Sequence, residues 1–171
     1  MTAYVALLRA VNVGGTGKLP MTELKAMCES AGLRQVRTYI ASGNVVFTSD
    51  EPETAVRAAI EAPLEAYAGK RVGVLVRSAA EMADLLARNP FADKPGNRTV
   101  ALFIDEPLAA DALAAAKNVK EEERRLGQRA VYISYGDGMA DSRLSIPGAK
   151  AGTARNMNTI AKLAEMAAAL D

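Results

Sequence analysis

The chain has 171 residues, of which 50% are hydrophobic and 24% are charged, and its formal net charge is +1. This is the composition of a folded globular protein, and the balanced charge excludes a global electrostatic attraction to nucleic acid or to an anionic membrane. Histidine is absent and Cys28 is the only cysteine, which excludes intramolecular disulfides, Ser/His or Cys/His nucleophilic sites and the commonest zinc sites.

The start of the chain and its cysteine content predict a cytoplasmic protein. Residues 1–8 carry no basic segment and Arg9 interrupts their apolar stretch, so neither a signal peptide nor a membrane span is expected. A lone cysteine fits a reducing compartment. We therefore expect no membrane partner, no metal and no cofactor, and the oligomeric state stays open.

The first half of the chain predicts the order β-α-β-β-α-β. Apolar runs and period-two alternation indicate strands, and apolar residues at helical spacing indicate helices. The expected elements are strands at 3–8, 36–40, 45–48 and 72–76 and helices that begin near Pro20 and Pro52. Asp50 and Glu53 have capping-box spacing around the second helix start, and Pro63 is expected to kink or shorten that helix.

The second half is expected to begin like the first. Capping-box spacing of Ser78 and Glu81 predicts a third helix. After it we expect a strand at 99–104, an alanine-rich helix from Asp105 to about Lys117, two strands around Gly127-Gln128 and a final helix from Thr153 to about Leu170. The fold class is therefore α/β (α+β), with two ferredoxin-like (split βαβ) lobes related by an imperfect duplication. The expected lobes are residues 1–77 and 78–171.

A first candidate binding site lies in the glycine-rich segment after the first strand. The order strand, glycines, lysine, helix resembles a phosphate-binding loop, but Asn12 and Leu19 stand where a Walker loop needs glycine and a hydroxyl residue. Backbone amides near a helix start can still bind an anion. The expected ligand-binding residues here are Arg9, Asn12, Gly14, Gly15 and Lys18. In the alternative interpretation the glycines serve only a tight strand-to-helix turn.

A second candidate site is the start of the final helix. Thr153 is expected to cap this helix, which would place Arg155 in the first turn, where the helix dipole disfavours a cation. A negative partner is then required. It is either an internal carboxylate, with Asp137 and Asp141 nearest upstream, or a bound anion. Thr153, Arg155 and Asn156 are the ligand-binding candidates of this segment.

The predicted hairpin in the first lobe adds two further candidates, Ser42 and Asn44. A tight hairpin also requires residues such as Gly43 and Asn44, so both can be structural. We expect this hairpin at the opposite end of the sheet from the glycine-rich segment, so that one lobe could not combine the two. The charged run at 120–125 is expected to be a solvated edge strand.

Three motifs together resemble the bacterial domain-of-unknown-function 1697 family. They are Leu7 to Gly15 with Lys18 and Pro20-Met21, then Arg37 to Ile40 with Ser42 to Phe47, and finally Thr153 to Thr159. Ala10 and Met157 stand where the family usually has glycine and tryptophan. The resemblance implies an α/β fold with duplicated ferredoxin-like elements, and it implies no activity, substrate or catalytic residue.

The sequence is compatible with two functions. The favoured one is binding of a small anion, a nucleotide or a phosphorylated metabolite, with enzymatic activity left open. The alternative is a non-catalytic module that binds single-stranded nucleic acid or a protein partner across an open sheet face. The net charge and the lack of RNA-motif aromatic residues count against the alternative.

Overall fold

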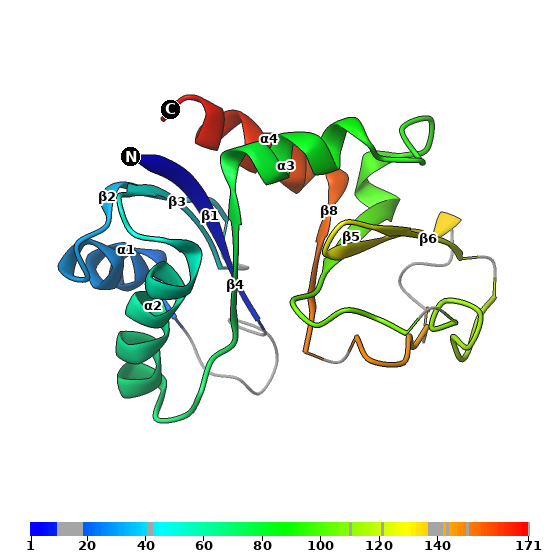
Figure 1. Cartoon of the computed structure of the whole chain (residues 1–171), viewed down its shortest axis with the longest axis horizontal. Coiled ribbons are helices and arrows are strands. Elements are labelled where there is room, and N and C mark those ends of the chain that lie inside the picture. Colours follow the sequence, from blue (N-terminus) through cyan, green and yellow to red (C-terminus); the bar gives the residue numbers. More distant parts are fainter. Residues whose placement is uncertain are drawn as a thin grey trace. The chain divides into compact units, whose positions relative to one another are not determined.

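The computed structural model describes residues 1–9, 19–40, 43–109, 111–120, 122–136, 142, 144–149 and 151–170. The chain divides into two compact units, Met1–Ala83 with Lys162–Asp171, and Asp84–Ala161. In this division residues 78–83 and 162–171, which were expected in the second lobe of 78–171, belong to the first unit. The described residues form two four-stranded antiparallel sheets and four α-helices, a mixed α+β fold (Figure 1).

The first unit has the predicted order β-α-β-β-α-β. Its elements are β1 (Thr2–Leu8), α1 (Met21–Ser30), β2 (Arg34–Thr38), β3 (Asn44–Ser49), α2 (Glu53–Ala68) and β4 (Val74–Ser78). The strand order is β2-β3-β1-β4, and neighbouring strands are antiparallel. The hydrophobic periodicity of the sequence was thus sufficient to predict the order of helices and strands in this unit.

The central strands of the first sheet are buried on both faces. Tyr4, Ala6 and Leu8 of β1 pack in one hydrophobic cluster with residues of α1 and α2. The Tyr4 ring also stacks on Phe47 of β3, with the ring centroids 5.8 Å apart. The alternate residues of β1 point to the opposite face and are buried as well. Such burial on both faces explains why β1 is a near-continuous apolar run.

The β2–β3 hairpin lies at the same end of the sheet as the end of β1, and the expectation of opposite ends was wrong. Leu7 pairs with Asn44 in an antiparallel register, and the Leu8 amide donates to the Gly43 carbonyl over 2.9 Å. In a split βαβ unit the inserted strand runs antiparallel to both strands beside it. The start of β3 therefore lies beside the end of β1.

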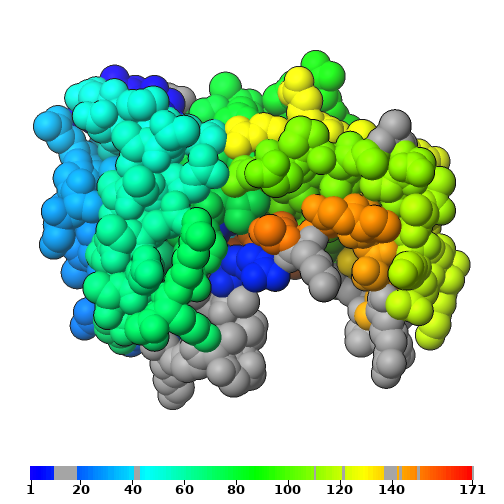
Figure 2. Space-filling view, turned by 60° about the horizontal axis from the view of Figure 1, so that its bottom comes forward, coloured from blue at the N-terminus to red at the C-terminus, as the bar shows by residue number. Residues whose placement is uncertain are grey.

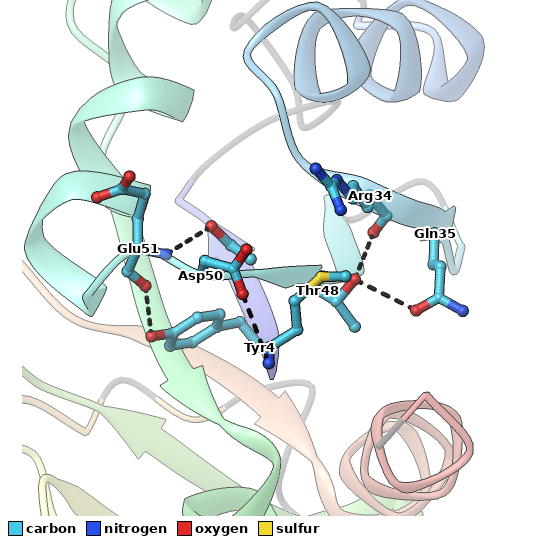
Figure 3. Close-up of polar contacts among 8 residues, drawn as sticks. Tyr4, Arg34, Gln35, Thr48, Asp50 and Glu51 are labelled. Atoms are coloured by element: carbon cyan, nitrogen blue, oxygen red, sulfur yellow. Dashed lines mark hydrogen bonds and ion pairs between the residues drawn. The ribbon is translucent and has the colours of Figure 1, made fainter.

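The helix α2 starts without the capping box expected from Asp50 and Glu53. Pro52 precedes the first helical residue and no side chain caps it. The Asp50 carboxylate instead lies 3.5 Å from the Met1 amino group. The Glu51 amide donates to the Ser49 hydroxyl, and the Glu51 carbonyl accepts from Tyr4, so this turn is held by other partners (Figure 3).

Proline inside α2 does not end the helix. Pro63 lies in its second half, yet α2 continues to Ala68 and ends at Gly69 in the left-handed conformation. Val56, Ile60 and Leu64 are buried along one face. Their burial offsets the backbone hydrogen bond that a proline removes from a helix interior.

The second unit repeats the strand order of the first. It contains η1 (Gly96–Arg98), β5 (Thr99–Phe103), β6 (Glu123–Gly127), β7 (Ala130–Ser134) and β8 (Thr153–Asn156). The order β6-β7-β5-β8 corresponds strand by strand to β2-β3-β1-β4. The helices α3 (Ala79–Ala87) and α4 (Met157–Ala168) each follow the fourth strand of a sheet. The predicted duplication is thus visible in the strand topology.

The predicted alanine-rich helix between Asp105 and Lys117 is absent from the described residues of that segment. Residues 111–115 form turns, and Lys117 pairs with Ser145 in an isolated β-bridge. Ala112, Ile146 and Ala149 are buried in the cluster on one face of the sheet. Irregular segments thus supply apolar residues that α1 and α2 supply in the first unit, and tertiary packing outweighs the helix propensity of alanine.

The third helix begins as predicted. The Ser78 amide donates to the Glu81 carboxylate over 3.0 Å, and the Glu81 amide donates to the Ser78 hydroxyl over 3.1 Å. This is a complete capping box. In the described parts of the chain, no helix is both long and apolar enough to cross a membrane.

Candidate functional site

Three chain segments meet at one end of the first sheet, and we call this place the Arg9 end. The Leu8 amide donates to the Gly43 carbonyl, and the Arg9 amide donates to the Gly73 carbonyl, each over 2.9 Å. A Cβ atom on Gly73 would lie 3.4 Å from the Arg9 Cβ. The end of β1 is therefore fixed between the β2–β3 turn and the segment that leads into β4.

Arg9 is an exposed cation on a fixed backbone. It is the first residue after β1, and its side chain is exposed to solvent. The glycine-rich segment follows it directly in the chain. Asn12, Gly14, Gly15 and Lys18, the other expected residues of this site, lie outside the described residues.

The backbone at the Arg9 end includes an unusual conformation. Ile40 has φ 51° and is 50% exposed, and Gly43 has φ 89°. A β-branched residue at positive φ is disfavoured, by on the order of 1–3 kcal/mol. Such conformations concentrate at functional sites, so the strained turn beside Arg9 is consistent with a site at this end.

Asn44 closes the hairpin from inside the protein. Its side-chain amide donates to the Tyr39 carbonyl over 2.9 Å, and the Tyr39 amide donates to the Asn44 carbonyl over 3.0 Å. The residue is fully buried. Asn44 thus supports the turn rather than offering its amide to solvent. Ser42, the other hairpin candidate, lies outside the described residues.

The segment of the second candidate site is a strand, and the expected helix start at Thr153 was wrong. Thr153, Ala154 and Arg155 pair with Phe103, Leu102 and Ala101 of β5. The helix begins at Met157, and the side-chain oxygen of Asn156 accepts from the Thr159 amide over 2.8 Å. Asn156 is therefore the capping residue, because strand pairing keeps Thr153 to Arg155 extended.

Arg155 is buried in this strand rather than presented at a helix start. Its side chain is 8% exposed, and its Nη1 donates to the Thr153 hydroxyl over 2.9 Å and to the Ala154 carbonyl over 3.0 Å. Burial lowers the pKa of its guanidinium to about 10. The dipole argument no longer applies, and the guanidinium is poorly placed to take an anion from solution.

A second buried arginine, which the sequence analysis missed, occupies the matching place in the first unit. Arg77 of β4 is 2% exposed, and its Nη1 donates to the Val76 carbonyl over 2.8 Å. The next residue, Ser78, caps α3 as Asn156 caps α4. The shared pattern is a strand that ends in arginine and a capping residue just before a helix, and it supports a structural role for Arg155.

These observations can be set beside known proteins. The sequence pattern described as "Protein of unknown function (DUF1697)" matches residues 1–132, which is more than half of the chain. The chain belongs to this family. The matched region contains β1 to β6 and ends within β7 (Ala130–Ser134), whereas the third motif, Thr153 to Thr159, lies beyond it. No curated protein matches the chain.

A solved structure has a similar fold over nearly the whole chain. The chain is similar to the conserved bacterial protein SP0830 from Streptococcus pneumoniae, with 24% sequence identity and a TM-score of 0.78. The alignment covers 96% of this chain and 98% of that one. At this identity the likeness concerns the fold, and it assigns no activity to the DUF1697 chain.

The charged run at 120–125 hides a buried carboxylate. The Lys120 amide and the Ser142 hydroxyl donate to the Glu122 carboxylate over 2.6 and 2.7 Å. The Ser142 bond, helped by the Lys120 amide, lowers the pKa of Glu122. Burial and the Glu122 charge raise the pKa of the Tyr135 hydroxyl. An ionised carboxylate held in this way is a structural acceptor, and it ties Ser142 to the start of β6.

The strand β6 lies at the edge of its sheet, as predicted, and its arginines fold back on the backbone. Nη1 of Arg124 donates to the Glu122 carbonyl over 3.0 Å, and Nη1 of Arg125 donates to the Arg124 carbonyl over 2.8 Å. Arg125 also lies over the Phe91 ring, 6.0 Å from its centroid.

Among the described residues, no group of histidine, cysteine, aspartate or glutamate could hold a metal ion.

Proposed function

We propose that the chain binds a small anionic ligand, a nucleotide or a phosphorylated metabolite, at the Arg9 end of the first sheet. The observation that carries this proposal is the position of Arg9. Its backbone is fixed by the hydrogen bond to Gly73, and its side chain is exposed where three chain segments meet. A guanidinium group binds phosphate and carboxylate oxygens through paired, charge-assisted hydrogen bonds.

The sequence after Arg9 supports the same ligand class. Asn12, Gly14, Gly15 and Lys18 follow within nine positions of Arg9. Glycines allow backbone amides to approach an anion closely, and Lys18 would add a second positive charge. Because α1 begins at Met21, this segment leads into a helix start, where the dipole also favours an anion. No catalytic residue is assigned.

The alternative, binding of nucleic acid or a protein across an open sheet face, has less support. Such binding needs exposed side chains on the face of a sheet. All residues of β3 and β7 and six of the seven residues of β1 are buried. These strands therefore offer no open face for such binding.

Calorimetric titration with inorganic pyrophosphate, ADP and 3-phosphoglycerate tests the proposal. Wild-type protein is expected to bind at least one of these ligands more weakly as the salt concentration rises, since the contact is ionic. Arg9→Gln should weaken the binding about tenfold, which corresponds to one lost charge-assisted hydrogen bond. Lys18→Gln should weaken it as well.

Arg34→Gln is the matched control for Arg9→Gln. Arg34 is an exposed arginine that begins β2 and pairs with Thr48, so it lies at the other end of the same sheet. The variant makes the same charge change in the same unit and should bind the ligand like wild type. If none of the ligands binds at millimolar concentration, or if both variants weaken binding equally, the Arg9 site is wrong.

A further inference from the structure

A groove runs between α1 and α2 in the first unit, away from the Arg9 end in sequence. Its volume is about 550 Å³. Figure 2 shows the side chains of α1, in blue, beside those of α2, in blue-green. The groove is lined by Glu23, Ala26, Met27, Ser30, Ala31, Ala59 and Pro63. The volume falls within the range of about 300–1,000 Å³ found for small-molecule sites.

The proline in α2 changes the backbone of one groove wall. Pro63 has no amide hydrogen, so it cannot donate to the carbonyl of Ala59, four residues earlier. Ala59 and Pro63 both line the groove. The helix continues past this point to Ala68, so the missing donor is a permanent feature of the wall. The groove is therefore built beside a carbonyl that lacks its regular helical partner.

The opposite wall, from α1, contributes acceptors and one charge. Among the described residues that line the groove, Glu23 alone is charged, and Ser30 adds a hydroxyl. None of the ion pairs found within the described residues involves Glu23. Met27 and the alanines of the lining provide an apolar surface. A methionine thioether packs well against an aromatic ring.

We propose that this groove binds a small organic cation, an ammonium group attached to an aromatic or alkyl body. The ammonium would lie near the Glu23 carboxylate and donate to the Ala59 carbonyl, and the body would lie on Met27. A carboxylate, a hydroxyl and a carbonyl short of its donor all accept hydrogen bonds, so the few polar groups of this mainly apolar lining suit a donor-rich cation, and the Glu23 charge repels an anion. Glu23 lies in the first turn of α1, and its full negative charge outweighs there the helix dipole, which by itself disfavours a cation.

Binding of 2-phenylethylammonium chloride, followed by two-dimensional NMR, tests the proposal. When the ligand is titrated into the wild-type chain, we expect chemical-shift changes confined to the backbone amides of α1 and α2. Glu23→Gln should weaken binding about tenfold, because it removes the only charge of the lining. Glu29→Gln is the matched control, since Glu29 is exposed on the same helix but does not line the groove, and it should bind as wild type.

Pro63→Ala separates a binding role from a structural one. The variant restores an amide that can donate to Ala59, so it should raise the thermal midpoint while weakening binding several-fold. A residue with only a structural role would not couple a gain in stability to a loss of affinity. Three outcomes would each overturn the proposal. They are no change in amide chemical shifts at a roughly 10-fold excess of ligand over about 1 mM protein, binding by Glu23→Gln as tight as by wild type, and binding of the neutral analogue 2-phenylethanol as tight as that of the cation.

Discussion

Removal of the Thr153 hydroxyl should destabilise the protein through Arg155. Thr153→Val keeps the shape of the side chain and replaces the acceptor of the 2.9 Å bond from Nη1 with a methyl group. Both side chains are 8% exposed. A hydrogen bond to a charged group contributes about 1.5–3 kcal/mol; Nη1 would lose this bond and keep the one to the Ala154 carbonyl. We expect a loss of about 2 kcal/mol in the free energy of unfolding.

Urea unfolding at neutral pH, followed by circular dichroism, measures this loss. For a chain of this length 2 kcal/mol corresponds to a fall of roughly 4–8 °C in thermal midpoint. Thr153→Ser keeps a hydroxyl and should retain most of the stability. In a background of Arg155→Met the cost of Thr153→Val should nearly vanish, because the donor is gone. An unchanged midpoint, or the same cost in both backgrounds, would refute the role given to this bond.

Three further changes test other parts of the structure by urea unfolding. Asn156→Ala should cost about 1 kcal/mol and Asn156→Asp almost nothing, since aspartate also caps helices; equal costs would contradict the capping role. Gly152→Ala should lower the free energy of unfolding by more than about 2 kcal/mol, because the new Cβ would lie 2.5 Å from the Phe103 carbonyl oxygen and 3.2 Å from that of Ala149. A variant as stable as wild type would mean that β5 can shift away from the new Cβ. Burial raises the pKa of the Cys28 thiol from 9.0 to about 12. Above pH 9 the folded state therefore keeps a thiol proton that the unfolded state releases. The stability that the neutral thiol contributes is present below pH 9 and is lost as the pH rises toward 12. Cys28→Ala should therefore lose less stability than wild type between about pH 8 and pH 10, and parallel curves would contradict the shift.

The first unit could be predicted from the sequence because its signals agree with one another. The apolar run of β1, the helical spacing of α1 and the capping box of Ser78 each specify one local structure, and packing preserves all three. The expected position of the β2–β3 hairpin was wrong because β3 was assumed to run parallel to β1, whereas the two strands are antiparallel. Once β3 is recognised as the inserted antiparallel strand, the Arg9 end follows from the same sequence.

The second unit was predicted less well, because long-range pairing overrides its local signals. Thr153 and Asn156 are both good capping residues, and only the pairing of Thr153 with Phe103 decides between them. The alanines of 109–116 favour a helix locally, yet residues 111–115 form turns and Ala112 is buried in the cluster on the sheet, so tertiary packing decides the structure of this segment. Arg77 escaped notice because nothing in a single sequence separates a buried arginine from a solvated one.

The arginines of β6 have a consequence for how the protein behaves at high concentration. A bare edge strand recruits further strands through its free carbonyls and amides, and aggregation begins in this way. The carbonyl of Glu122, just before β6, and that of Arg124, within it, already accept from guanidinium groups of β6. An arriving strand must first displace these side chains, whose charges also repel a second copy of the same edge. Growth of the sheet on this side is thereby disfavoured.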